Sequence, residues 1–296
     1  MPNPTPNITI PVDLTNPGQF FACCGLLELA DRLWPGAEGW FGQTQFCMGT
    51  DDPRKTLDEL LKEIISCPLR PTIPPDDSAR LQTLVQKQHD LKRRGRVLPK
   101  FEEAERKRLN SLRIYSGFTL DSPFSIRVDW WLNDACGGAD LKTWAGKQEV
   151  AVIAREIKNS LKPEVADDLF AFETVIRRQS DGAPVAPLSF DSGRAGTAQD
   201  IGYSPDKIGQ ALTARVWTEF LCLIGLQRFA VAPAADGLFD LSIWSVPLPV
   251  MCAAAAAKGG IPSVAAAQAK FRLAARDTGN RYKAFTDNVS LIWRLP

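Results

Sequence analysis

Segments with strand periodicity and segments with helix periodicity are interspersed along this chain, but they do not alternate strictly. Strict alternation is typical of a parallel sheet covered by helices, whereas an irregular order favours sheets and helices that pack as separate layers. The 296 residues suffice for one large domain or two ordinary ones. We predict an α+β fold with a mixed-sheet body at 1–203 and a C-terminal part at 204–296, mostly helical with one strand.

The N-terminal region carries the clearest local signals. Residues 7–14 alternate apolar and polar side chains, which predicts a strand. Asn16 and Pro17 then suit the cap and first turn of a helix, whose apolar side chains recur at helical spacing as far as Leu33. By the same criteria we expect strands at 39–49 and 124–132, and helices at 52–65, 150–161 and 164–177.

The second half of the chain is less regular. Residues 183–203 have little periodicity and several glycines, which indicates a loop. Ser204 can cap a helix that continues through Trp217 and Ile224. We expect a strand at 239–250 and a final alanine-rich helix at 263–276.

Several enzyme classes lack their residues in this sequence. His89 is the only histidine, so catalysis that needs imidazole beside other specific groups is not supported. No phosphate-binding G-x-x-x-x-G-K-[ST] loop and no G-x-G-x-x-G after a strand occurs. The seven cysteines form no C-x-x-C pair, and most lie in apolar runs, as buried thiols in a reducing compartment do. We therefore expect a protein without enzymatic activity, cofactor or metal.

The N-terminus has no signal-peptide pattern, and no apolar run is long enough to cross a membrane. We expect a cytoplasmic protein with no membrane partner.

Positive charge is concentrated although the net charge is only +1. Residues 86–113 contain ten bases and four acids, a local charge of +6 that leaves −5 for the rest. The surrounding segment, 76–113, is predicted to be a helical excursion from the body, divided near Gly95–Pro99. Clustered bases suit contacts with phosphates, although a solvated helix face has the same composition. The candidate residues are Lys87, Lys92, Arg93, Arg94, Arg96 and Lys100.

A second basic stretch covers 270–294, with six bases and two acids. Its candidate nucleic-acid-binding residues are Arg272, Arg276, Arg281 and Lys283. They are interleaved with Phe271, Tyr282 and Phe285, which suit either stacking on bases or, as we favour, a place in the core.

The segment from Asp191 to Tyr203 combines glycines with hydroxyl side chains and Arg194. Such a loop can direct backbone N–H groups and a guanidinium at an anion or a base edge. We favour binding through Arg194 over a purely flexible connection.

Three alternatives remain open at this stage. Asp76 and Glu105 resemble part of a metal-dependent nuclease pattern, but Glu105 lies in a segment with the composition of a solvated helix. An RNA-binding or RNA-processing subunit with a ferredoxin-like core would need acid–base groups that are scarce here. A structural scaffold without nucleic-acid contacts is the third.

Two strings of residues resemble a known family. They are Thr15–Leu29 (TNPGQFFACCGLLEL) and the stretch from Asp191 (DSGRAG) to Pro205. Both are similar to the Csb-type CRISPR-associated protein of type I-G (I-U) systems, which is grouped with the large subunits of Cascade. The likeness extends over most of the chain, but this chain is shorter than typical large subunits.

The resemblance implies a non-catalytic subunit of a guide-RNA complex. Its expected partners are guide RNA, target DNA, the backbone and guide-processing subunits of Cascade, and a separate helicase-nuclease. Large subunits help to recognise the short motif that flanks the target and to recruit the nuclease. In RNA-guided systems the protein reads that motif and the nucleic-acid backbone, while base pairing reads sequence.

Overall fold

The computed structural model describes residues 5–133, 138–145, 148–194, 212–275 and 282–294. Helices pack beside several small sheets, and all pairings between the named strands are antiparallel. The predicted α+β class is confirmed.

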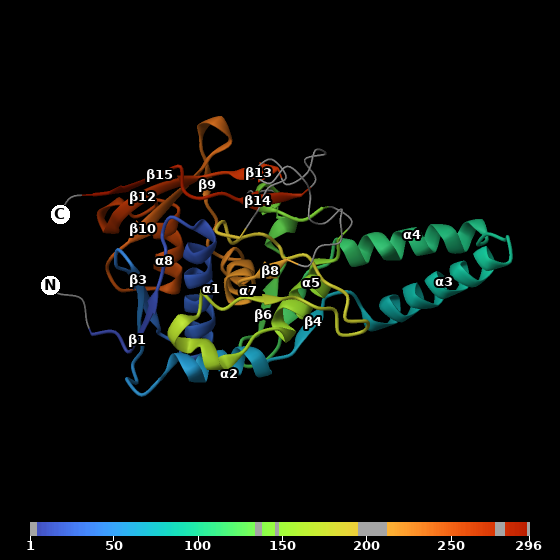
Figure 1. Cartoon of the computed structure of the whole chain (residues 1–296), viewed down its shortest axis with the longest axis horizontal. Helices are drawn as coiled ribbons and strands as arrows, with labels where there is room; N and C mark the ends of the chain where they lie inside the picture. The colour runs from blue at the N-terminus through green and yellow to red at the C-terminus, as the bar shows by residue number, and fades with distance from the viewer. Residues whose placement is uncertain (1–4, 134–137, 146–147, 195–211, 276–281, 295–296) are drawn as a thin grey trace.

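Helix α1 (Pro17–Leu33) lies in the centre of the body (Figure 1). It begins as predicted: the Asn16 side chain accepts a hydrogen bond from the Gly18 backbone N–H at 3.0 Å, and Pro17 occupies the first turn. All residues from Pro17 to Ala30 are buried, so α1 has a solvent-facing side only near its end. It packs against α7 (Val216–Gly225), which is buried along its whole length.

Two four-stranded sheets pack against α1. The first has the order β1-β3-β2-β11 and the second the order β15-β12-β10-β9. The Phe20 ring on α1 contacts Phe41 of the first sheet and Trp244 of the second, with centroids 5.1 and 6.0 Å apart. Their strands are β1 (Ile8–Pro11), β2 (Glu38–Phe41), β3 (Gln45–Gly49), β9 (Ala232–Pro233), β10 (Phe239–Trp244), β11 (Leu248–Pro249), β12 (Ala265–Phe271) and β15 (Ser290–Trp293).

Shorter elements complete the body. The helices are α2 (Leu57–Ser66), α5 (Val150–Asn159) and α8 (Val250–Ala257). The strands are β4 (Leu69–Pro71), β5 (Phe118–Leu120), β6 (Ile126–Val128), β7 (Thr174–Val175), β8 (Thr213–Ala214), β13 (Leu273–Ala275) and β14 (Lys283–Phe285).

One hydrophobic core contains residues from both sides of the predicted boundary at 203. It runs from Ile8 to Phe285, and β11 from the C-terminal part pairs with β2 of the N-terminal part. Position 203 itself and the predicted helix start at Ser204 lie outside the described residues.

Four predicted elements of the N-terminal part differ in the structure. Residues 39–49 form a hairpin of β2 and β3 rather than one strand. Helix α2 begins at Leu57 because Thr56, not a residue near 52, caps it. Strand β6 ends at Val128 and gives way to a short 3-10 helix at Trp130–Leu132. The helix expected at 164–177 is wrong: a 3-10 turn at Pro163–Asp168 is followed by β7, which pairs with β8.

The C-terminal part is also richer in strands than predicted. The expected helix at 263–276 is wrong, because residues 265–271 form β12 between β10 and β15. Ala267, Ala269 and Phe271 point into the core while Gln268 and Lys270 are exposed. This period of two fits the pleat of a strand, and the pairing on both edges outweighs the helix preference of alanine.

Two further expectations concern the cysteines and the lack of a membrane-spanning segment. Five of the described cysteines are buried, Cys252 is exposed, all six are free, and Cys136 lies outside the described residues. None of the described helices combines the length and apolar character needed to cross a bilayer.

Candidate nucleic-acid interface

A helical hairpin projects from the body at the predicted excursion (Figure 1). It consists of α3 (Pro75–Arg93) and α4 (Lys100–Ile114), divided at the predicted place. Leu81 and Leu84 of α3 and Leu109 of α4 form a small core of their own. The hairpin is therefore held by few apolar contacts and exposes most of its charged side chains.

The turn between the helices is compact. The backbone N–H groups of Arg94 and Arg96 both donate to the Leu91 carbonyl at 2.9 Å. Gly95 has a φ of +66°, in the left-handed region that favours glycine. Leu98 is buried and closes the end of the hairpin. The turn thus holds the bases on either side of Gly95 close together.

Many bases of the hairpin are paired with acids of the same protein. Lys87, one of the predicted site residues, pairs with Glu102 at 2.7 Å. Hydrogen bonds from Arg80 lower the pKa of Glu105 below its ordinary value, and those from Arg106 do the same for the pKa of Glu103. The remaining pairs are Lys107–Glu103, Arg108–Asp77 and Arg113–Glu149.

The bases at the end of the hairpin differ from the paired ones. Lys92, Arg93, Arg94, Arg96 and Lys100 are all exposed, and none forms an ion pair with any residue that the structure describes. We call these five residues the tip cluster. No acid in the described part of the chain lies within ion-pair distance to offset their mutual repulsion, so a bound polyanion would stabilise this end of the hairpin.

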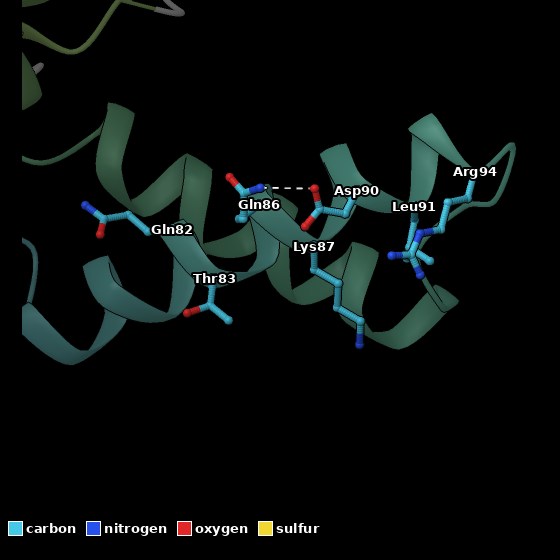
Figure 2. Close-up of a pocket in the computed structure, with 7 residues that line it drawn as sticks. All are labelled: Gln82, Thr83, Gln86, Lys87, Asp90, Leu91 and Arg94. Carbon is cyan, nitrogen blue, oxygen red and sulfur yellow. Dashed lines mark hydrogen bonds between the residues drawn. The ribbon is translucent and has the colours of Figure 1, made fainter.

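A shallow depression runs along α3 toward the tip cluster (Figure 2). Gln86 donates a hydrogen bond to Asp90, one turn further along α3, at 3.1 Å, and Arg94 lies at the end of the depression. Amide, hydroxyl, ammonium and guanidinium groups line it together with the Asp90 carboxylate, and all but the carboxylate are groups that contact sugar and phosphate oxygens. The lining residues are Gln82, Thr83, Gln86, Lys87, Asp90, Leu91 and Arg94.

Exposed apolar residues accompany the basic ones. Val97 in the turn is 88% exposed and Phe101 in the first turn of α4 is 69% exposed. Tyr115, at the other end of α4, is 61% exposed. Nothing in the sequence marks these residues as exposed, because an aromatic residue in an amphipathic helix is usually a core residue.

Arg194 is engaged by an acid of the same protein. Its guanidinium bonds to Glu173, with Nε 2.6 Å from the carboxylate, and Arg215 is 3.5 Å from the same carboxylate. Arg194 is nevertheless exposed to solvent. The loop continues from 195 into residues outside the described ranges.

The two strings that carry the family resemblance meet in the structure. The Asn16 amide donates to the buried Asp191 carboxylate at 2.6 Å, and its oxygen also accepts a hydrogen bond from the Ser192 N–H. A Cβ on Gly18 would lie 2.2 Å from the Phe190 carbonyl oxygen, so only glycine permits this approach. Glu219 of α7 accepts hydrogen bonds from the backbone N–H groups of Phe190 and Asp191.

The C-terminal candidates are dispersed differently. Arg272 is exposed and Lys283 half-buried, while Arg276 and Arg281 lie outside the described residues. Phe271 and Phe285 belong to the core, with ring centroids 5.2 Å apart, so the core interpretation of these two rings is confirmed. β13 and β14 lie on the body, not on the hairpin (Figure 1).

One of the two acids of the nuclease alternative, Glu105, is engaged within the hairpin. Both Glu105 oxygens accept hydrogen bonds from Arg80. No group of three or more His, Cys, Asp or Glu side chains gathers as a metal site within the described ranges. The Glu105 carboxylate is thus held in an ion pair with Arg80 of the neighbouring helix.

Comparisons with known proteins assign no family. No protein-family profile matches the chain. No curated protein matches it either.

Proposed function

We propose that this protein is a non-catalytic subunit of a type I CRISPR RNA-guided surveillance complex and binds nucleic acid through its helical hairpin. The observation that carries the proposal is the tip cluster, five exposed bases without an acidic partner among the described residues. Each base that neutralises a phosphate releases a counterion, which is the main source of affinity for a nucleic-acid backbone.

The pattern of ion pairs within the hairpin favours the tip cluster over the bases nearer the body as the binding surface. Bases near the body are paired with acids of α3, α4 or Glu149, so they contribute little field beyond the hairpin. The depression on α3 adds polar side chains next to Arg94. Together these features favour backbone contacts, which position a strand without reading its sequence.

The placement within a Cascade complex rests on the family resemblance. Its two strings contact each other through Asn16 and Asp191, and that contact is compatible with a shared role. Guide RNA, target DNA, the other Cascade subunits and a helicase-nuclease are the proposed partners, in the cytoplasm. Motif recognition and nuclease recruitment would then be tasks of this chain's assembled form.

Co-purification combined with photo-crosslinking tests this proposal. The tagged full chain is purified from its native cells without nuclease, irradiated and digested, and crosslinked peptides are mapped. We expect RNA of uniform length, several companion proteins, and crosslinks within residues 87–101. A chain that brings down no nucleic acid, or that crosslinks only through the body, would contradict it.

A matched pair of variants controls for charge. The tip variant replaces Lys92, Arg93, Arg94 and Arg96 with Gln, and the root variant replaces Arg80, Arg106, Lys107 and Arg113 with Gln. Each removes four positive charges. Only the tip variant is expected to lose the crosslinks.

A further inference from the structure

A line of three exposed side chains runs along one side of α4. Phe101, Arg108 and Tyr115 are spaced by seven residues, close to two helical turns, so they lie nearly above one another with a drift of about 20° per step. Phe101 is 69% and Tyr115 61% exposed, and the Arg108 side chain is 64% exposed. We call these three residues the α4 stripe.

The stripe lies on the solvent side of α4, and of its three side chains Arg108 reaches toward α3 through Asp77. Leu109, which packs against α3, is fully buried and follows Arg108 by one residue, a turn of roughly 100° around the helix. At 1.5 Å per residue, the backbone positions of Phe101 and Tyr115 lie about 21 Å apart along the helix axis. This length accommodates several nucleotides of a single strand.

The stripe is continuous with the tip cluster. Lys100 precedes Phe101 directly, and Arg96 and the 88% exposed Val97 lie in the adjoining turn. The Arg108 guanidinium has one ion-pair contact among the described residues, to Asp77 at 3.8 Å, which is near the limit for such a pair. Lys107 beside it is 71% exposed and 3.6 Å from Glu103.

We propose that the α4 stripe binds single-stranded nucleic acid, with Phe101 and Tyr115 stacking on bases and Arg108 contacting the strand between them. This inference rests on the proposed function and adds the class of strand that the hairpin holds. In a duplex the faces of the bases are stacked on one another, whereas in a single strand they are available to aromatic side chains.

Charge favours a nucleic acid over a protein in this position. Phe, Tyr and Arg are common at protein interfaces as well, so the neighbouring lysines decide: lysine is depleted from such interfaces, whereas Lys100 and Lys107 border the stripe. The stripe also begins at the tip cluster, whose five bases have no ion pair among the described residues. An aromatic ring next to basic side chains is the arrangement by which single strands are bound without sequence preference. The ligand that fits the stripe is therefore a polyanion with accessible bases, which is single-stranded nucleic acid.

The test measures the affinity of the full chain for a fluorescent oligothymidine strand and for a duplex of equal length. The stripe variant carries Phe101→Leu and Tyr115→Leu, which keep apolar side chains but remove the rings. We expect single-strand affinity to fall by about ten-fold or more, since each stacked base contributes substantially. Duplex affinity should change less than about two-fold, because backbone contacts persist.

Two further variants report stacking itself. A protein that carries Phe101→Tyr and keeps the native Tyr115 should bind the single strand nearly as tightly as wild type, because a tyrosine ring also stacks on bases. Phe101→Trp places an indole at the exposed site, and seven of the chain's eight native tryptophans are buried. Its fluorescence should be quenched on addition of oligothymidine and not on addition of the duplex.

The outcomes separate this inference from the proposed function. If the stripe variant binds the single strand as wild type does while the tip variant binds weakly, the stripe inference is overturned and the proposed function stands. If wild type binds neither strand nor duplex, both are overturned. If the stripe variant keeps its single-strand affinity but loses a companion protein on purification, the stripe is a protein interface instead.

Discussion

The crossing of α1 and α7 provides the sharpest test of the core. Gly25 on α1 and Gly225 on α7 let the two backbones touch: a Cβ on Gly25 would lie 2.0 Å from the Leu221 carbonyl oxygen, and one on Gly225 2.1 Å from the Phe21 carbonyl oxygen. Local helix preference and packing make opposite predictions for Gly25→Ala. Alanine in a helix interior is favoured over glycine by about 1 kcal/mol.

The packing cost follows from the geometry. An ordinary contact of a Cβ atom with a neighbouring atom requires about 3.4 Å, so the two helices must separate by about 1.4 Å at the crossing. Packed helices have axes about 8–10 Å apart, which sets the width of the gap that opens between them. α7 has ten residues and is about 15 Å long. The gap opened along it approaches about 170 Å³, a cost of about 4 kcal/mol if the core does not relax and about half of that if it does.

After the helix-preference gain, Gly25→Ala should destabilise the protein by about 1–3 kcal/mol, the usual range for overpacking. Urea unfolding of the full chain measures this free energy. Ala104→Gly on the exposed side of α4 serves as the control and should cost about 1 kcal/mol, because it changes helix preference alone. A Gly25→Ala protein as stable as wild type would refute the close crossing.

Three further substitutions test buried polar groups. Asn16→Ala removes the α1 cap and leaves Asp191 without its amide donor, so unfolding free energy should fall by about 2–4 kcal/mol in urea titration. Although burial raises the pKa of Glu28, hydrogen bonds from Arg228 and Arg32 outweigh it and set the pKa below the ordinary 4.5. The ionised Glu28 therefore contributes to the free energy of unfolding above about pH 4.5, and this contribution is lost as the pH falls through the lowered pKa of Glu28. Glu28→Gln should make the free energy of unfolding fall less steeply in acid. Burial raises the pKa of Asp191 above its ordinary 3.8, so its contribution is lost as the pH rises through the raised value, and Asp191→Asn should flatten that decline instead. Unchanged pH profiles in either variant would contradict these assignments.

Helix α1 and the hairpin were predictable because their signals are local. Asn16 and Pro17 mark the start of α1 within two residues, and the change from Arg94 to Pro99 divides α3 from α4. Neither requires knowledge of distant contacts. Charge composition likewise marked residues 86–113 as basic before any geometry was known, and binding of nucleic acid there stays a prediction.

Other elements depended on distant partners. Residues 265–271 become a strand because β10 and β15 pair with both edges, which a run of alanines does not reveal. In the hairpin, the pairing of Arg80 with Glu105 and of Lys87 with Glu102 follows from the register of α3 against α4. Sequence alone therefore could not separate the paired bases from the tip cluster.

The aromatic residues of α4 illustrate the same limit. Phe101 and Tyr115 have the spacing of a buried face, yet the hairpin has only a small core and leaves both exposed. Conversely, Arg194 was predicted as a contact from its glycine-rich surroundings, and its pairing with Glu173 arises from β7, which was expected to be a helix. Whether Arg194 contacts nucleic acid stays a prediction.

The salt dependence of nucleic-acid binding tests the tip cluster most directly. The logarithm of the affinity is measured against the logarithm of salt concentration for wild type, the tip variant and the root variant. The slope is negative, and each lost phosphate contact should reduce its magnitude by about 0.7 on a single strand or about 0.9 on a duplex. We predict a slope smaller by about three units for the tip variant and nearly unchanged for the root variant. Equal slopes for all three proteins, or equal losses in both variants, would contradict the assignment of binding to Lys92, Arg93, Arg94 and Arg96.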